Sequence, residues 1–156
     1  MAIFRITIIA LLLFTTVKVM AQDRAQGAVD MGEAIAAGEA PEELNIKIKR
    51  FFNLIRDEKI FEAYDKILNL SPLSEKKDKI RRLIAETEKA MEVYGSLLDF
   101  EPVMAERVTD SFFKLHYLGL HADYPVRWIF TYYRSPERGW IVTNLRFDDL
   151  SEFYFD

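Results

Sequence analysis

Two different spacings of hydrophobic residues divide the chain near Gly95. Before this residue, apolar side chains recur every three or four positions, which is the period of an α-helix with one buried face. After it, runs rich in aromatic and β-branched residues alternate with polar ones, which is the period of a β-strand. The order predicts helices followed by strands, and hence an α+β domain whose helices cover one face of a sheet.

Three helices are expected before Gly95. Pro41 suits the first turn of a helix, because its missing N–H has no intrahelical partner there. Pro72 marks a turn after the second helix, Ser74 is a suitable N-cap for the third, and Gly95 is a suitable C′ residue. The apolar faces are Leu44, Ile48, Phe51, Phe52 and Ile55 in the first helix, Ile60, Phe61, Tyr64, Ile67 and Leu68 in the second, and Ile80, Leu83, Ile84, Met91 and Tyr94 in the third.

Four strands are expected after Gly95, at residues 97–109, 112–121, 124–134 and 140–148. The connections between them are only two to five residues long, and short connections join antiparallel neighbours. The expected fold class is therefore α+β, with three N-terminal helices packed on a four-stranded antiparallel sheet.

The last hairpin predicts two unlike faces. Its five-residue loop, SPERG, pairs Arg134 with Trp140, and counting outward from that pair assigns every side chain to a face. We expect the more aliphatic face, with Ile129, Tyr133, Ile141, Leu145 and Phe147, to pack under the helices. We expect the aromatic face to form a homodimer, because a large exposed aromatic surface on a monomer is a liability; its residues are Trp128, Phe130, Tyr132, Trp140, Val142 and Arg146. The alternative is that residues 149–156 fold back over this face.

The N-terminus carries an export pattern. Arg5 precedes the largely apolar run Ile6–Met20, and Val19-Met20-Ala21 fits the small-residue rule for signal peptidase. This predicts a signal peptide at residues 1–21, a flexible lead rich in Ala, Gly and Glu at 22–43, and one domain at 44–156. The expected location is periplasmic or secreted, without membrane contact after cleavage. The alternative is an uncleaved N-terminal anchor.

Composition excludes several classes of function. The chain has no Cys, which removes thiol nucleophiles, thiolate metal sites and disulfides. It has 21 basic and 25 acidic residues, and removal of Arg5 and Lys18 with the signal leaves 19 and 25, a net charge of about −6. Such a chain lacks the basic surplus that nucleic-acid binding requires. Known phosphate, zinc and hydrolase motifs are absent, so we expect no cofactor.

A basic run lies at the start of the third expected helix, from Lys76 to Arg82. We interpret it as a solvated helix face, because acidic residues are interspersed with the basic ones along the helix. The alternative is a patch that contacts an anionic surface.

The sequence resembles the nuclear-transport-factor-2-like superfamily, in particular its small exported members of unknown function. The resemblance lies in FEAY at 61–64, YGS at 94–96, residues 125–133, and the stretch from Gly139-Trp140 to Asp149. It implies a cone-shaped α+β fold in which a curved sheet and the helices surround a pocket, with frequent dimers through the convex face. The superfamily includes isomerases, dehydratases, polyketide cyclases and non-catalytic binding modules, so fold alone does not choose among them.

We expect an exported, non-catalytic binding module for a small apolar ligand or a protein partner. The predicted pocket residues are Phe52, Tyr64, Tyr94, His116, Ile129, Tyr133 and Phe147. The alternative is a small-molecule isomerase or dehydratase that uses a pocket carboxylate or His116 as its base. Asp99 has the pattern of an exposed strand edge, so we assign no catalytic residue. His116 and His121 fall on opposite faces of one strand, so we expect no metal site.

Overall fold

The structure is a computed structural model that describes residues 33–36 and 39–150. All of the described residues belong to one compact unit, Met31–Asp156. The predicted signal peptide at 1–21 therefore lies outside the described part. Within that part, no helix combines the length and the apolar character needed to cross a membrane.

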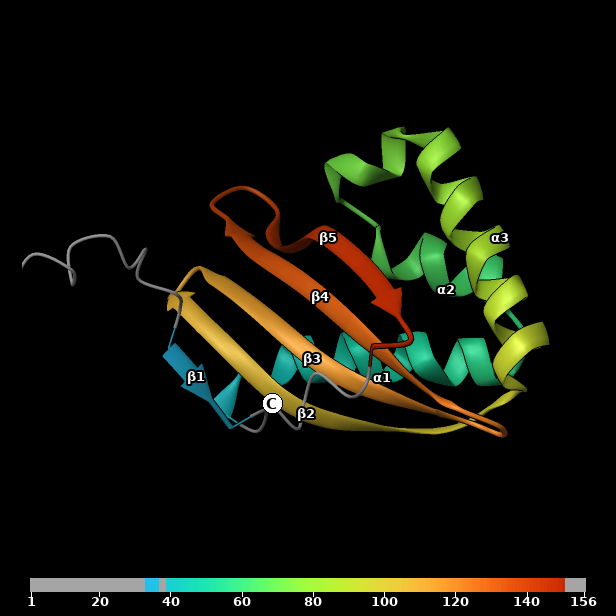
Figure 1. The fold of residues 1–156 in the computed structure, drawn as a ribbon. Coiled ribbons are helices and arrows are strands. Elements are labelled where there is room, and N and C mark those ends of the chain that lie inside the picture. The colour runs from blue at the N-terminus through green and yellow to red at the C-terminus, as the bar shows by residue number, and fades with distance from the viewer. Residues whose placement is uncertain (1–32, 37–38, 151–156) are drawn as a thin grey trace, which may run out of the picture. The chain divides into compact units, whose positions relative to one another are not determined.

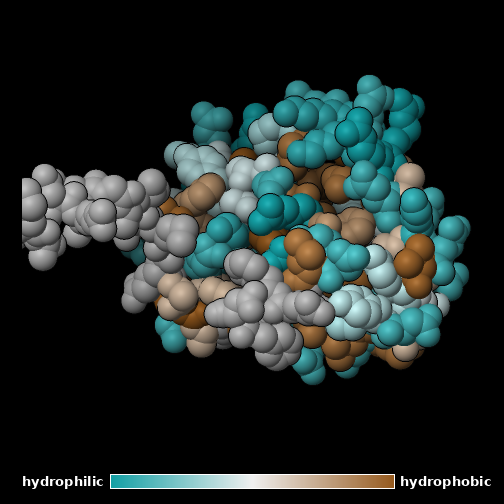
Figure 2. All heavy atoms as spheres, viewed as in Figure 1, coloured by the Kyte–Doolittle hydropathy of each residue, from teal (hydrophilic) through white to brown (hydrophobic). Residues whose placement is uncertain are grey.

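Three α-helices precede most of the sheet, as predicted: α1 (Glu42–Arg56), α2 (Ile60–Ile67) and α3 (Lys77–Tyr94). Ser74, the expected N-cap of the third helix, lies instead within the short 3₁₀ helix η2 (Pro72–Glu75), and α3 starts three residues after it. Ser71 caps η2 by accepting a hydrogen bond from the backbone N–H of Leu73. Hydrophilic side chains cover the outer surface of α3 and η2 (Figure 2).

The sheet has five antiparallel strands in sequence order: β1 (Glu33–Ile35), β2 (Leu97–Thr109), β3 (Phe112–His121), β4 (Pro125–Ser135) and β5 (Gly139–Asp148) (Figure 1). The four long strands match the prediction. The expectation of four strands and of a flexible lead over 22–43 is corrected by β1, which lies within that lead and pairs with the edge of β2. Three residues are too few to show strand alternation, so the sequence pattern could not reveal β1.

A β-bulge in β5 changes which side chains share a face. Arg134 pairs with Trp140 as predicted, and Tyr132 pairs with Val142. The extra residue Thr143 then intervenes, so Thr131 pairs with Asn144. Because strand side chains alternate, one inserted residue moves the rest of β5 to the other face. Beyond the bulge the pairs are Phe130 with Leu145 and Trp128 with Phe147.

The aromatic face of the hairpin is the core of the domain and not a subunit contact, which corrects our assignment of the two faces. Helix α1 lies across this face, and the ring of Phe51 meets Trp128 at 5.5 Å and Phe130 at 5.6 Å between centroids. Burying large rings between a helix and a sheet removes more apolar surface from water than burying the aliphatic face would. The predicted interface residues Trp128, Phe130, Tyr132, Val142 and Trp140 are all buried here.

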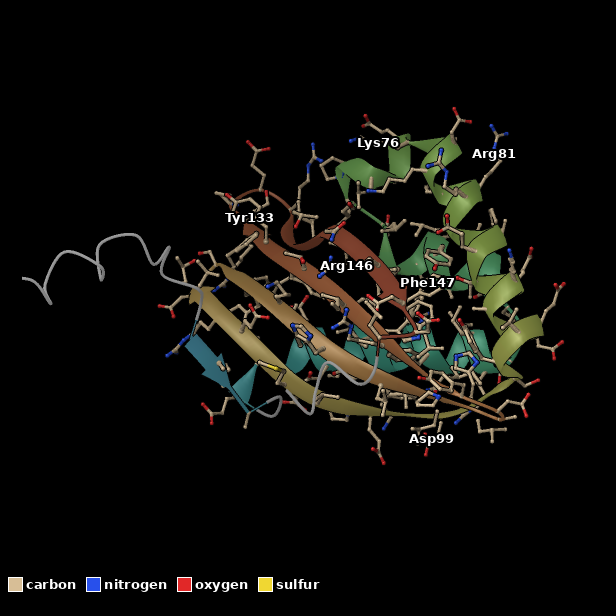
Figure 3. The ribbon with its side chains drawn as sticks, viewed as in Figure 1. Lys76, Arg81, Asp99, Tyr133, Arg146 and Phe147 are labelled. Carbon is tan, nitrogen blue, oxygen red and sulfur yellow. The ribbon has the colours of Figure 1, made fainter. Side chains whose placement is uncertain are left out.

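The opposite face of the sheet carries Ile129, Tyr133 and Ile141, three of the five residues that we expected under the helices, whereas Leu145 and Phe147 lie on the helix side because of the bulge. Ile129 pairs with Arg146, and Tyr133 pairs with Ile141, so these side chains face away from α1. Arg146 is exposed, and Tyr133 is 38% exposed (Figure 3). The aromatic surface on which we based the predicted homodimer is therefore buried inside the domain.

Candidate functional site

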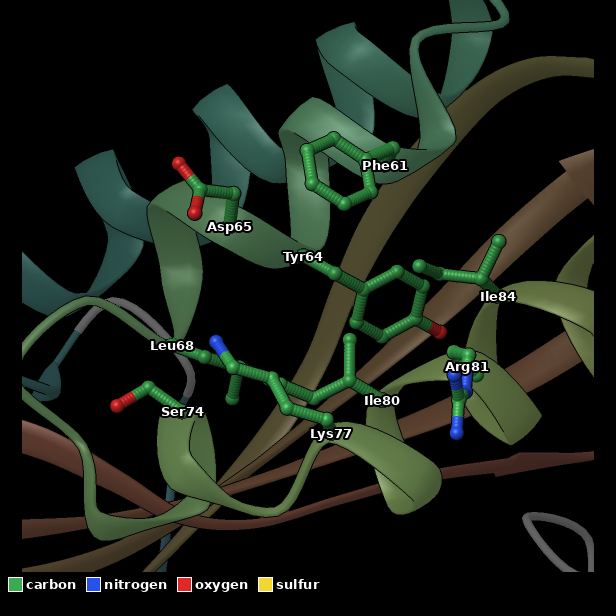
Figure 4. Close-up of a pocket in the computed structure, with 9 residues that line it drawn as sticks. All are labelled: Phe61, Tyr64, Asp65, Leu68, Ser74, Lys77, Ile80, Arg81 and Ile84. Atoms are coloured by element: carbon green, nitrogen blue, oxygen red, sulfur yellow. The ribbon is translucent and has the colours of Figure 1, made fainter.

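A pocket of about 330 Å³ lies between α2, η2 and α3 (Figure 4). Its α2 and α3 residues each follow the spacing i, i+3, i+4, i+7, so each set forms one stripe along its helix. The two stripes face each other because η2 turns the chain back between the helices. Nine residues line the pocket: Phe61, Tyr64, Asp65 and Leu68 from α2 and its C-cap, Ser74 from η2, and Lys77, Ile80, Arg81 and Ile84 from α3.

The floor of the pocket is apolar, even where it contains a phenol. Thr87 Oγ1 donates to the carbonyl oxygen of Leu83 at 2.8 Å, so its proton is already used. The hydroxyl of Tyr64 must therefore be the donor in its 2.7 Å hydrogen bond with Thr87. Burial raises the pKa of Tyr64 far above its usual value, so the group stays protonated. What Tyr64 offers a ligand is its ring, beside the side chains of Leu68, Ile80 and Ile84.

The rim of the pocket combines an exposed ring with two cations. Phe61 is 71% exposed, although a phenyl ring of this size normally avoids water. Lys77 and Arg81 are one helical turn apart on α3. Arg81 forms an exposed ion pair with Asp78, whereas Lys77 makes no ion pair or hydrogen bond with any residue that the structure describes.

The seven residues predicted to line one pocket do not come together. Phe52, Tyr64 and Phe147 lie on the helix side of the sheet, and of the seven only Tyr64 lines the observed pocket. The space expected between sheet and helices is filled by rings, because Phe52 stacks on Phe100 at 4.6 Å and Trp128 stacks on Phe147 at 4.4 Å.

The other predicted pocket residues lie elsewhere. Tyr94, at the end of α3, donates a hydrogen bond to Asp149 at 2.9 Å. His116, Ile129 and Tyr133 are on the face of the sheet turned away from the helices. The alternation of β3 and β4 puts them there, so the prediction that they share a pocket with Phe52 is wrong.

The two histidines lie on opposite faces of β3, as predicted. His116 Nε2 is 2.7 Å from Glu106 Oε1, and Lys114 Nζ donates to the other oxygen of the same carboxylate at 2.6 Å. Burial lowers the pKa of His116, while its hydrogen bond with Glu106 opposes that shift. On the other face, His121 Nδ1 donates to the carbonyl oxygen of Gly95 at 2.7 Å. His116 is thus held by a contact within the sheet and His121 by the C-cap residue of α3, and neither lines the pocket.

The acidic residues considered as bases are also outside the pocket. Asp99 is exposed on β2, where its carboxylate accepts a hydrogen bond from the backbone N–H of Phe100 (Figure 3). The carboxylate that does line the pocket is Asp65, which the sequence did not single out. In the described ranges, no three His, Asp or Glu side chains are grouped so that they could hold a metal ion.

Comparison with known proteins found no matching family model, no matching curated protein and no matching solved structure.

Proposed function

We propose that this protein is a non-catalytic binding module that holds the apolar part of a small ligand between α2 and α3. The observation that carries the proposal is the pocket itself, with its apolar floor and the exposed ring of Phe61 at its edge. Its volume of about 330 Å³ falls at the small end of the range of roughly 300–1,000 Å³ typical of ligand sites. A ligand that covered Phe61 would remove an unfavourable exposed ring from water.

The residues of the pocket give little support to an isomerase or dehydratase. Such a reaction needs a base and a proton donor that converge on one substrate. The phenol of Tyr64 already donates to Thr87 and is held in its protonated form by burial. His116 lies on the far face of the sheet, where it is bonded to Glu106. These placements favour binding over catalysis.

A fluorescence titration tests the binding function. N-phenyl-1-naphthylamine is a neutral apolar probe that brightens when it leaves water. We expect Phe61→Ser to weaken its affinity by roughly tenfold, which corresponds to losing most of the contact of one buried phenyl ring. Ile46→Ser is the matched control, because Ile46 is 59% exposed on α1 and does not line the pocket. Equal affinities of the two variants, or no binding by the unaltered chain, would contradict the proposal.

We also propose that the protein is exported and is a divergent relative of the nuclear-transport-factor-2-like superfamily. Export is supported by the charged and apolar pattern before Ala21. The relationship is supported by helices packed on an antiparallel sheet whose four long strands follow them in the chain. Expression of the full chain in a bacterium, followed by N-terminal sequencing of the extracytoplasmic fraction, tests the export. A mature chain that begins at Gln22 supports the proposal, and an intact Met1 in the cytoplasm refutes it.

A further inference from the structure

The pocket lies beside the most basic segment of an acidic protein. Residues 76–82 read KKDKIRR, with five basic residues and one acidic residue, in a chain of net charge −4. Two of these five basic residues, Lys77 and Arg81, line the pocket. Lys76 and Arg81 stand at the same end of the molecule, around the first turns of α3 (Figure 3). The positive charge is therefore concentrated at one edge of an apolar cavity.

The two cations lie one helical turn apart on the same wall of the pocket, and both have long, exposed side chains that can turn toward a bound headgroup. Side chains four residues apart on a helix have Cβ atoms about 5–6 Å apart. In Figure 4 the Lys77 side chain extends along the pocket toward Leu68, and Arg81 lies near the hydroxyl end of Tyr64. Asp65, the one carboxylate of the lining, is on the α2 wall and points away from Lys77 in this view (Figure 4). Among the residues that line the pocket, two cations and one carboxylate give a net positive charge.

Neither cation is already satisfied by a strong contact. The side chain of Lys77 has no ion pair or hydrogen bond to any described residue. The partner of Arg81 is Asp78, and both side chains are highly exposed, at 77% and 87% of their surface. Exposed pairs of this kind contribute little free energy, because water and salt screen them. An anion that bound at the rim would therefore lose little free energy by displacing the contact between Arg81 and Asp78. Because the rim is exposed, the anion would also keep part of its own hydration.

We propose that the ligand of this pocket is an anionic amphiphile, a single alkyl chain that ends in a carboxylate or a similar headgroup. The inference rests on the proposed binding function of the same pocket. The chain packs on Leu68, Ile80 and Ile84, and the headgroup accepts charge-assisted hydrogen bonds from Lys77 and Arg81. Such a molecule can be free in solution or extracted from a membrane, and both sources present the same chemistry to the pocket.

A headgroup series at constant tail length tests the charge preference. Decanoate, 1-decanol and decyltrimethylammonium have tails of the same length and differ in head charge; the two ions are titrated calorimetrically below their micellar concentrations, and decanol below its solubility limit. We expect decanoate to bind about tenfold more tightly than decanol at low salt, with decyltrimethylammonium the weakest of the three. The advantage of decanoate should shrink at high ionic strength, because salt screens exposed charges.

Four glutamine variants on α3 test which side chains contact the headgroup. Lys77→Gln and Arg81→Gln should each remove most of the advantage of decanoate over decanol. Lys79→Gln and Arg82→Gln remove the same charge from the same helix but lie outside the pocket lining, so they should change it less than about twofold. If all four variants weaken decanoate equally, a diffuse positive field explains the preference and the placement at Lys77 and Arg81 is wrong.

The remaining outcomes distinguish the anionic headgroup from the binding function on which it rests. Equal affinities for decanoate and decanol overturn the anionic headgroup and leave the binding function standing, whereas failure of all three ligands to bind overturns both. Sedimentation with phosphatidylcholine vesicles that contain phosphatidylglycerol distinguishes the sources. Decanoate binding without vesicle binding identifies a free ligand, and binding of both identifies the membrane as the source. Vesicle binding without decanoate binding assigns the basic segment to a membrane surface and refutes the pocket ligand.

Discussion

Truncation of Phe130 to alanine removes a ring that the structure encloses completely. Phe130 is 0% exposed on β4, and its ring centroid lies 5.6 Å from that of Phe51, 5.8 Å from Phe52 and 6.0 Å from Tyr117. Removing a fully buried phenyl ring costs about 3–5 kcal/mol, since the lost burial and the residual cavity both count. Typical domains are stable by about 5–15 kcal/mol, so this one change should consume a large part of the stability.

Urea unfolding followed by tryptophan fluorescence measures this effect, because Trp128 lies in the same core. For a denaturant slope of about 2 kcal/mol per molar, the expected loss lowers the unfolding midpoint by roughly 2 M. Tyr133→Ala is the matched control, because Tyr133 lies on the opposite face of the same strand and is 38% exposed. Its midpoint should move by far less, corresponding to less than about 1 kcal/mol.

A different pair of results would refute the assignment of faces. If Phe130→Ala kept the stability of the parent chain and instead reduced its sedimentation coefficient, the aromatic face would be an intermolecular surface. If the alanine variant does not accumulate in folded form, Phe130→Leu replaces it. That variant should show a smaller loss of stability and an unchanged sedimentation coefficient.

Three further predictions concern the backbone and the titrating groups. In thermal unfolding, Gly95→Ala should destabilise the protein by roughly 1–3 kcal/mol more than Gly139→Ala. Both glycines have positive φ, but only at Gly95 does an added Cβ meet another methyl, that of Ala122, at 2.7 Å. Equal losses of stability would contradict this prediction. Burial acts to raise the pKa of Asp148, but hydrogen bonds from its arginine partner on β4 outweigh this and lower it. The stability that Asp148 contributes is therefore present at neutral pH and is lost as the pH falls below 3.8 through the lowered pKa. In urea titrations, the difference in unfolding free energy between the parent chain and Asp148→Asn should therefore close in that pH range. A difference that widens instead would refute the ion pair. In NMR titrations the pKa of His116 should lie below 6.5, and Glu106→Gln should lower it further by removing the bond that favours the charged imidazolium; a rise in that variant would show that Glu106 is not its partner.

The elements of this fold could be predicted where the hydrophobic period is long. The face of α1 from Leu44 to Ile55 is buried as its spacing predicted, and the four long strands begin and end within a residue of the predicted bounds. Their signals are local, because helix and strand periods depend only on neighbouring residues. The edge strand β1 has no such signal, since it is defined by its pairing with β2.

The assignment of faces failed at one residue. Thr143 is neither Gly nor Pro, so nothing in the local sequence marks a bulge there. The simple register was right from Arg134 to Tyr132 and inverted for β5 beyond the bulge. The choice of buried face in β4 failed for a different reason. Which face of β4 is buried depends on the shape of α1. The rings of Phe51 and Phe52 pack closely against the large ring of Trp128, whereas small aliphatic side chains in its place would leave voids.

The site was only partly visible in the sequence. Leu68, Ile80 and Ile84 were recognised as apolar, but we assigned them to packing, and Lys77 and Arg81 to a solvated face. A stripe of apolar residues flanked by cations one turn apart was the available signal. Whether two such helices close on each other or leave a cavity depends on the angle between them, which is set by tertiary contacts that no local pattern encodes.

The pocket is built from one uninterrupted stretch of chain, because every lining residue falls between Phe61 and Ile84. None of the five strands contributes a lining side chain, although Ser71 in this stretch donates a hydrogen bond to the backbone carbonyl of Val142. The exposed lining side chains of this stretch can therefore be changed without altering the aromatic core that keeps the sheet and α1 together, provided that the attachment at Ser71 and the contact of Tyr64 with Phe51, 5.3 Å between ring centroids, are preserved.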